Sequence, residues 1–228
     1  MGKTAIIGSR GSIGKRYSCI FDYLGEPYIG YDVCGPFNKE AVIRFVLDNE
    51  ITRALICVPT DVHYDYCRIL SMMGVDYMVE KPLTKSPQEA EELANLAEKH
   101  RVNSHIVCNY KILLDDLKRH GKNQKKTFTE YNYFNTGKDG LLWDCCQLIM
   151  LNPEIEIYTD SPIWILKCGD SYVDYRMVEL SYLTMIRYWL DGNLKMLWDI
   201  HDAVEMVTIV LDRVMNERTF WDSSPQLQ

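Results

Sequence analysis

The sequence predicts an α/β protein with a doubly wound parallel sheet at its N-terminal end and a small α+β domain after it. Two observations predict the first part: short apolar runs alternate with longer amphipathic stretches, and Gly and Pro residues separate them. A third observation predicts the second part, because this alternation ends near Tyr110 and shorter strand patterns follow. We therefore expect one domain over residues 1–110 and a small α+β domain with a reduced antiparallel sheet over residues 111–228.

The elements of the first domain can be placed in order. Residues 3–8 (KTAIIG) form an apolar run typical of a strand buried on both faces, and residues 12–24 form a helical stretch that ends before Gly25. Ser86, Pro87 and Glu89 have the spacing of a helix N-cap with proline at the first position and a capping box. The other strands are predicted at 28–31, 54–58, 76–79 and 103–108, and the other helices at 39–49, about 61–73 and 87–100.

The pattern of the second domain is more mixed. Phe128 to Phe134 alternates in the manner of a half-buried strand, and a helix before it is expected to end at Gly121. Three short antiparallel strands are predicted at 154–158, 163–168 and 171–175, and helices are predicted at 111–119, 141–151, 180–190 and 199–217.

Composition excludes several classes of protein. A net charge of -7 and a sequence pI near 5.3 argue against a nucleic-acid-binding protein, whose binding face would be basic. We expect no membrane segment, because no run reaches the roughly 18 to 20 apolar residues that a spanning helix needs. The start of the sequence lacks the pattern of a secretion signal. The eight cysteines form no CxxC pair, which favours free thiols in the cytoplasm over disulfides or a metal site.

A glycine-rich loop follows the first strand and opens the first helix. Glycines at such a turn let the backbone approach a pyrophosphate, whose charge is met by N–H groups at the helix N-terminus. The loop therefore predicts a dinucleotide-binding domain of the Rossmann type, and the alternative is a tight turn without a ligand. Its residues are Gly8, Ser9, Arg10, Gly11, Ser12, Ile13 and Gly14.

Asp32 closes the second predicted strand, 18 residues after Gly14. A carboxylate at this position can accept hydrogen bonds from the ribose hydroxyls and repels a 2′-phosphate, which favours NAD. NADP is the alternative cofactor, because the guanidinium of Arg10 could pair with such a phosphate. Asp32 could also be an ordinary solvated turn residue.

Two further segments give the chain a family resemblance. Residues 54–63 (ALICVPTDVH) and 79–84 (VEKPLT) lie at the carboxyl ends of the third and fourth predicted strands. Together with the glycine loop, they resemble the Gfo/Idh/MocA family, the glucose–fructose oxidoreductase and inositol dehydrogenase group. The similarity continues through Asn109, Tyr110 and Lys111 and more weakly beyond them.

The resemblance implies an NAD(P)-dependent oxidoreductase that acts on a sugar, cyclitol or sugar-nucleotide-like substrate. It implies that Lys81 is catalytic and contacts the substrate, since an ammonium there would stabilise a developing alkoxide or relay its proton. Glu80 would orient Lys81, and Pro82 would fix the turn, often through a cis peptide bond. The cofactor cleft would be lined by Val58, Pro59, Thr60, His63, Glu80 and Lys81, with Lys81 beside the nicotinamide. Asp144 would be the second catalytic residue, and the substrate contacts would be Asn109, Lys111, Asp144 and Gln147.

One position departs from the family pattern of Asp-x-x-x-His on a helix of the second domain. Asp144 matches, but Leu148 stands four residues later, and Gln147 cannot accept a proton at neutral pH. The second sheet is also short for the family. The alternative function is therefore a non-catalytic protein that binds or senses a dinucleotide. A homo-oligomer formed through the C-terminal sheet is a further expectation.

Overall fold

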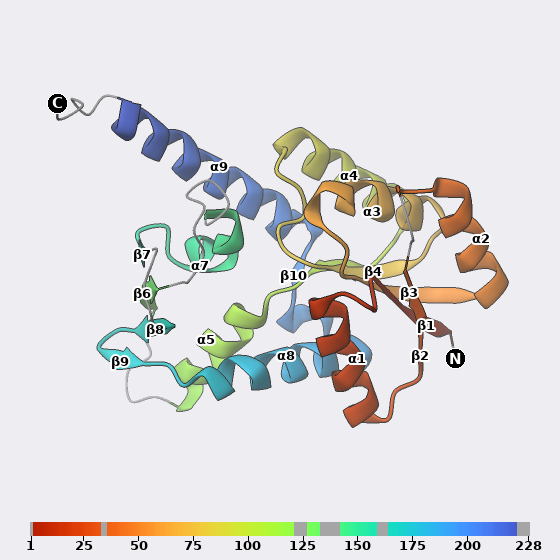
Figure 1. The fold of residues 1–228 in the computed structure, drawn as a ribbon, viewed down its shortest axis with the longest axis horizontal. Helices are drawn as coiled ribbons and strands as arrows, with labels where there is room; N and C mark the ends of the chain where they lie inside the picture. Colours follow the sequence, from red (N-terminus) through yellow and green to blue (C-terminus); the bar gives the residue numbers. More distant parts are fainter. Residues whose placement is uncertain (1, 33–35, 121–126, 133–141, 159–163, 223–228) are drawn as a thin grey trace. The chain divides into compact units, whose positions relative to one another are not determined.

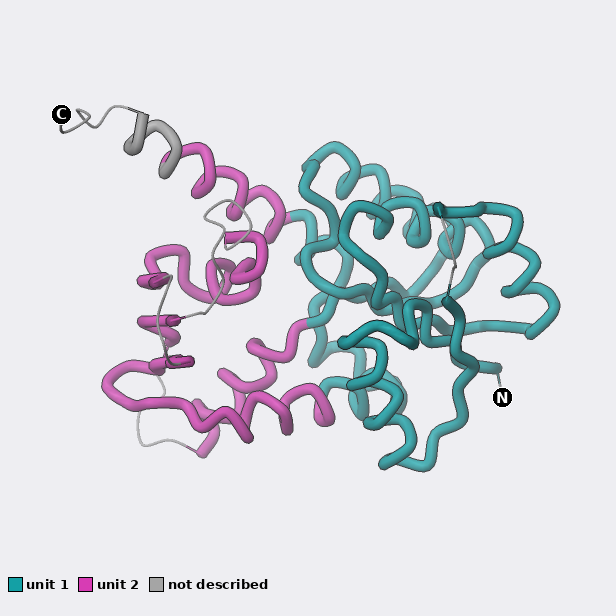
Figure 2. The backbone as a smooth tube through the Cα atoms, in the orientation of Figure 1, with its two compact units in different colours: residues 1–107, 185–204 teal, residues 108–184, 205–228 magenta. Residues whose placement is uncertain are grey.

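The computed structural model describes the backbone of residues 2–32, 36–120, 127–132, 142–158 and 164–222, with side chains up to residue 216. The chain forms two compact units, which Figure 2 colours separately. The first consists of Met1–Val107 and Met185–Val204, and the second consists of Cys108–Thr184 and Glu205–Gln228.

The first unit is built on a six-stranded sheet. Its order is β10-β5-β4-β3-β1-β2, with all neighbours parallel except β10, which is antiparallel to β5. The strands are β1 (Lys3–Ile7), β2 (Tyr28–Tyr31), β3 (Ile51–Ile56), β4 (Asp76–Val79), β5 (Ser104–Ile106) and β10 (Trp198–Asp199). The order reverses between β1 and β3, and ligands bind at such a switch point in open α/β sheets.

Helices cover both faces of this sheet. Figure 1 shows α2 (Lys39–Asn49), α3 (His63–Met72) and α4 (Pro87–His100) on one face and α1 (Ser12–Leu24) on the other. The central strands are therefore buried on both sides, with Ala5, Ile6, Leu55 and Ile56 at 0% exposure. This packing fixes the carboxyl ends of β1, β3 and β4, from which the loops of interest emerge.

The local signals at the helix ends behave as predicted. Gly25 adopts the left-handed conformation after α1, and the Ser86 side chain accepts a hydrogen bond from the Glu89 N–H at the start of α4. The third helix differs from the prediction, since a 3₁₀ turn (Thr60–Val62) comes before α3 and no side chain caps that helix.

The first unit also contains a segment from late in the chain, which the boundary prediction does not include. Met185–Val204 belongs to this unit because β10 pairs with β5, with Trp198 opposite Ile106. The sequence pattern instead predicts a helix that starts at Asp199. In the structure, Asp199 caps α9 (Ile200–Asp222) by accepting hydrogen bonds from the N–H groups of His201 and Asp202.

The second unit contains a four-stranded sheet of order β7-β6-β8-β9. Its strands are β6 (Phe128–Asn132), β7 (Glu156–Tyr158), β8 (Ile165–Cys168) and β9 (Ser171–Tyr172). The prediction of an antiparallel sheet is wrong at one edge: β7 pairs with β6 in parallel, while β6–β8 and β8–β9 are antiparallel. A parallel partner was not foreseen because strand pairing depends on contacts remote in sequence.

The helices of the second unit differ from their predicted bounds. They are α5 (Asn109–His120), α7 (Cys146–Leu151), the part of α8 (Tyr175–Leu190) up to Thr184 and the part of α9 from Glu205, and residues 142–144 form a helical turn before α7. The strand predicted at 171–175 ends early and α8 begins early, because Asp174 accepts the Arg176 N–H as a helix cap. Four predicted element ends lie outside the described residues. They are the helix stop at Gly121, the strand end at 133–135, the helix start at Leu141 and the strand start at Ile163.

Candidate functional site

The glycine loop between β1 and α1 needs glycine at two positions. Gly8 has φ +88, and a Cβ atom there would lie 2.6 Å from the backbone oxygen of Cys57. A Cβ atom on Gly14 would lie 2.1 Å from the backbone oxygen of Gly8. The middle glycine is less constrained, because a Cβ atom on Gly11 would be 3.3 Å from the Gly8 oxygen. The loop is therefore folded tightly under the start of α1.

The N-terminus of α1 is suited to an anion. Its N-cap residue is Gly11, no side chain caps the helix, and its first turn contains no acidic residue. Arg10, Gly11 and Ser12 are exposed. N–H groups at such a terminus carry partial positive charge and attract phosphate. These residues fit the diphosphate of a dinucleotide.

Asp32, directly after β2, is bound to this loop. Its carboxylate accepts a hydrogen bond from the Ser9 hydroxyl at 2.5 Å and one from the Arg10 N–H at 3.0 Å. The Arg10 side chain is 81% exposed, and its Nε lies 4.0 Å from the Asp32 carboxylate. Asp32 is thus not a solvated turn residue: it forms one structure with the glycine loop, and its side chain is 19% exposed.

The segment after β3 lies beside the glycine loop, because β3 is the neighbour of β1 in the sheet. Val58 and Thr60 are partly exposed, and Pro59 is exposed. Cys57 precedes them. Burial raises the pKa of its thiol, and the negative charges of Glu80 and Asp32 raise it further. The thiol therefore stays protonated at neutral pH and is unsuited to act as a nucleophile.

The turn after β4 carries Lys81. The peptide bond between Lys81 and Pro82 is cis, as the family resemblance implies. Glu80 is 7% exposed, and its carboxylate accepts a hydrogen bond from the Tyr17 hydroxyl at 2.7 Å. The other carboxylate oxygen accepts the Lys81 N–H at 3.2 Å. Lys81 itself is partly exposed, which leaves its position open to a ligand.

His63 is the first residue of α3, and its side chain is buried at 1% exposure. One ring nitrogen, Nδ1, lies 2.8 Å from the Pro82 oxygen, and Nε2 lies 2.8 Å from the Val58 oxygen. Burial lowers the pKa of His63, while the two carbonyls and the Glu80 charge act in the opposite direction. His63 thus lies in the first turn of α3, inside the helix predicted from about residue 61.

The four candidate residues of the second unit fall into two kinds. Asn109 and Gln147 are buried, at 0% and 2% exposure, and the Gln147 amide donates to the Asn109 side-chain oxygen at 3.0 Å. Gln147 also accepts the Tyr110 N–H at 3.1 Å. By contrast, Lys111 and Asp144 are partly exposed, and Lys111 pairs with Asp115 at 3.2 Å.

The structure explains the departure from the Asp-x-x-x-His pattern. Leu148 is 1% exposed and belongs to the core of the second unit. The position that carries a histidine in the family pattern is thus filled by an apolar side chain that helps to hold α7 in place. Asp144 keeps its partly exposed position in the preceding turn.

Tyr17 is a functional candidate that the sequence analysis missed. It lies on the buried face of α1 with Gly14 and Phe21, and it joins the glycine-loop helix to the Lys81 turn through Glu80. The spacing of Tyr17 along the helix identifies a core position. Its partner Glu80 is 63 residues away, so the local sequence pattern could not predict this hydrogen bond.

Two kinds of site are absent from the part of the chain that the structure describes. No group of three or more His, Cys, Asp or Glu side chains there could hold a metal ion. No helix there is both long and apolar enough to cross a bilayer. The seven cysteines in this part of the chain form no disulfide with one another.

Comparisons with known proteins give one family and many related folds. Residues 38–107 match the family model GFO_IDH_MocA, described as an oxidoreductase family with an NAD-binding Rossmann fold. A comparison with curated protein sequences gives no match.

Several solved structures share the fold at low sequence identity. The WlbA (WbpB) dehydrogenase from Thermus thermophilus, in complex with NAD and UDP-GlcNAcA, is 15% identical with a TM-score of 0.66, covering 92% of this chain and 94% of that chain. UDP-N-acetylglucosamine 3-dehydrogenase GnnA from Acidithiobacillus ferrooxidans is 14% identical with a TM-score of 0.66, covering 92% and 96%. The dehydrogenase MviM from Clostridium difficile is 13% identical with a TM-score of 0.67, covering 95% and 99%.

These likenesses establish the fold alone, and the family match covers residues 38–107 of the first unit. The match begins at Asn38 and runs through β3, the Lys81 turn and β5. The resemblance to the Gfo/Idh/MocA oxidoreductase family that the sequence motifs indicate is therefore confirmed over residues 38–107.

Proposed function

We propose that this protein is an NAD(P)-dependent oxidoreductase that transfers a hydride between nicotinamide and a hydroxyl-bearing carbon of a sugar, cyclitol or sugar-nucleotide-like substrate. The observation that carries the proposal is the arrangement of the first unit. The glycine loop and the Lys81 turn both leave the carboxyl edge of one parallel sheet, at or near the switch point between β1 and β3.

The residues of the first unit have distinct roles in this proposal. The N–H groups at the start of α1 bind the diphosphate, and Asp32 accepts hydrogen bonds from the adenosine ribose. NAD is the proposed cofactor because the Asp32 carboxylate would repel a 2′-phosphate, while exposed Arg10 keeps NADP as the alternative. The nicotinamide, when bound, accepts or donates the hydride.

Lys81 assists with the proton. When the substrate carbon loses a hydride, its hydroxyl oxygen loses a proton, which Lys81 would relay to solvent water while its positive charge stabilises the developing alkoxide. Glu80 cannot move freely, because Tyr17 and the Lys81 N–H bind both oxygens of its carboxylate. The Lys81 side chain is therefore presented from a fixed backbone, which favours a defined reaction geometry.

The second unit would supply the substrate contacts. Lys111 and Asp144 are the better candidates, because their side chains are partly exposed. Asn109 and Gln147 are proposed to contribute to substrate binding mainly by positioning these residues, since both are buried and hydrogen-bonded to each other. The sugar-nucleotide part of the proposal is supported by two fold relatives that, by name, bind or act on UDP-linked N-acetyl sugars.

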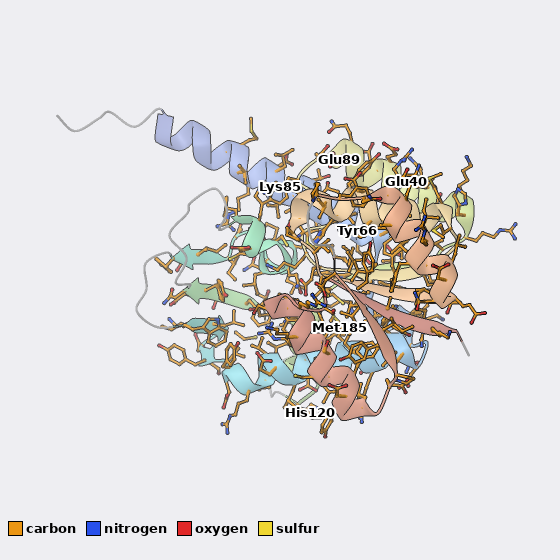
Figure 3. All side chains as sticks on the ribbon, turned by 45° about the vertical axis from the view of Figure 1, so that its right-hand side comes forward. Glu40, Tyr66, Lys85, Glu89, His120 and Met185 are labelled. Carbon is orange, nitrogen blue, oxygen red and sulfur yellow. The ribbon has the colours of Figure 1, made fainter. Side chains whose placement is uncertain are left out.

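The test is the formation of NADH, followed by absorbance, across a panel of polyols, cyclitols and sugar nucleotides. Turnover of at least one member is expected. Lys81→Ala should lower kcat by about 10²- to 10⁴-fold, the range for one general acid–base group, and leave NAD affinity nearly unchanged. The matched control is Lys85→Ala: this lysine, labelled in Figure 3, is more exposed and forms a surface ion pair with Asp61 at 3.6 Å. Equal activity of the Lys81 variant and the wild type would refute the assigned role.

A second candidate function is a protein that binds or senses a dinucleotide without turnover. The buried Leu148 at the family's histidine position favours it, because the second unit then lacks that proton acceptor. Tight NAD binding with no turnover of any panel member would select this function over the first.

The proposal extends to assembly and location. The second sheet exposes Tyr158 and Tyr172 at 49% and 71%, and we propose that this sheet forms the contact of a homo-oligomer. Sedimentation of the wild type and of a Tyr172→Glu variant would test this. A cytoplasmic location is proposed as well, supported by the cysteines of the described residues, which form no disulfide although several of them are buried.

A further inference from the structure

His63 joins two loops of the first unit through its two ring nitrogens. The Val58 oxygen belongs to the segment that follows β3, and the Pro82 oxygen belongs to the turn that follows β4. These strands are parallel neighbours, with Ile56 opposite Val79. Because both contacts are 2.8 Å long, the imidazole lies tightly between the two loops.

The contacts of His63 indicate a role beyond packing in the core. A carbonyl oxygen only accepts, so the neutral ring donates from one nitrogen and the imidazolium donates from both. An apolar side chain could fill the same buried space without any polar group to satisfy. His105 provides a comparison: it is also buried, at 5% exposure, its Nδ1 lies 3.2 Å from the Trp198 oxygen, and its Nε2 has no hydrogen-bond partner in the described structure.

Both residues that flank Lys81 are held by buried side chains. On one side, the Tyr17 hydroxyl binds the Glu80 carboxylate, and on the other side His63 contacts the Pro82 carbonyl. Tyr17 belongs to α1 and His63 to α3, so the two anchors come from opposite faces of the sheet. Lys81 between them is partly exposed. The turn therefore presents one side chain from a backbone fixed at two points.

We propose that His63 is a positioning residue: by tying the Pro82 carbonyl to the segment after β3, it fixes the place from which the Lys81 ammonium reaches the substrate hydroxyl. This inference rests on the proposed function, since a fixed ammonium affects turnover only where Lys81 takes part in the reaction. His63 itself touches neither substrate nor reacting atoms in this account.

The experiment compares His63→Phe with the wild type and uses His105→Phe as the matched control. Phe keeps a planar ring in each buried site and removes the one N–H donor of the neutral imidazole. Two quantities are measured: the amide hydrogen exchange of a peptide covering Glu80 to Thr84, and kcat and KM with NAD and the best substrate of the panel. His63→Gln, which keeps one donor, serves as a second variant if the Phe variant does not fold.

In His63→Phe, we expect exchange in the Glu80–Thr84 peptide to accelerate by about tenfold, because the turn loses its bond to the neighbouring loop. The value of kcat should fall by about 10- to 100-fold, the scale of a misplaced catalytic group, and KM for NAD should change by less than about threefold. His105→Phe should leave both quantities at wild-type values, and His63→Gln should lie between.

The two readouts separate the failure of this inference from the failure of the proposed function. Unchanged exchange in the His63 variants would overturn the positioning role whatever the activity. Faster exchange with unchanged kcat would also overturn it. A wild type that turns over no substrate would refute the proposed function, and the exchange result would still decide whether His63 fixes the turn.

Discussion

The two units place their candidate residues in different ways. In the first unit, the candidate residues lie on loops at the carboxyl edge of the sheet. Buried side chains such as Tyr17 and His63 contact these loops and hold them in place. In the second unit, two of the four candidates, Asn109 and Gln147, are themselves buried and joined by a hydrogen bond. In the first unit, the candidate ligand-contacting residues are thus distinct from the buried residues that position them. In the second unit, the four candidates include both exposed and buried residues.

This difference explains why the candidate cofactor residues are held more rigidly than the candidate substrate residues. Backbone geometry requires Gly8 and Gly14, so the glycine loop cannot be altered without moving β3 or α1. In the second unit, Asn109 and Gln147 are held by a hydrogen bond between their side chains and not by the backbone. The following predictions test this comparison.

The largest effect is expected for Gly14→Ala. The added Cβ atom would be placed 2.1 Å from the Gly8 oxygen, so α1 must move, and NAD affinity should fall by more than about 100-fold with a loss of about 3 kcal/mol of stability. Calorimetric titration and thermal unfolding measure the two quantities. Gly11→Ala is the matched control, because its Cβ atom is 3.3 Å from the same oxygen and stability should be nearly unchanged. Equal behaviour of the two variants would contradict the tight loop.

Asp32→Ala should have the second largest effect. It removes the carboxylate that would accept the ribose hydroxyls, and NAD affinity is expected to fall by about tenfold, the value of one hydrogen bond to a charged group. The affinity for NADP should fall less, so the preference for NAD narrows. Titration of both nucleotides tests this, and an unchanged ratio of the two affinities would rule out the ribose role.

Gln147→Leu tests the second unit. The change leaves the Asn109 side-chain oxygen and the Tyr110 N–H without this partner, so the free energy of unfolding should fall by about 2 kcal/mol. Gln88→Leu, at an exposed position of α4, should change it by less than about 0.5 kcal/mol. Denaturant titration measures both. A Gln147 variant as stable as the wild type would show that the Asn109–Gln147 pair does not support the unit.

The smallest effect concerns pH. Burial lowers the pKa values of His63 and His105 in the folded protein, so the unfolded chain binds protons more readily once the pH falls below about 6.5. The stability due to the neutral rings is thus fully present above that pH and is lost toward the lower folded pKa. Each histidine should contribute a slope of at most about 1.4 kcal/mol per pH unit in this window.

Urea titrations between about pH 7 and pH 5 measure this slope, since the expected window lies below the unfolded pKa of histidine. In His105→Phe the decline should be shallower than in the wild type, because one of the two rings is gone. A decline as steep as that of the wild type would mean that His105 titrates equally in both states.

Much of the first unit could be predicted because its signals are local. α1, β2, α2, β4 and α4 have the predicted bounds, since glycine, proline and capping residues such as Ser86 mark their ends. The glycine loop and the cis peptide bond before Pro82 were likewise expected from short motifs. Each of these features depends on residues within a few positions of one another.

The remainder depends on contacts remote in sequence. β10 is too short to show a strand pattern and exists through its pairing with β5, and β7 finds a parallel partner in β6 that no local pattern marks. The bond from Tyr17 to Glu80 and the contact from His63 to Pro82 join different helices to the same turn. The burial of Asn109 and Gln147 also follows from packing and could not be read from their polar side chains.

The central claim is that the loop between β1 and α1 binds the diphosphate of a nicotinamide dinucleotide. Isothermal titration of the wild-type protein with NAD and NADH tests it directly, with adenosine as a ligand that lacks the diphosphate. The account predicts saturable heat with at least one of the dinucleotides and much weaker binding of adenosine. Absence of binding heat with either dinucleotide at several temperatures would contradict it.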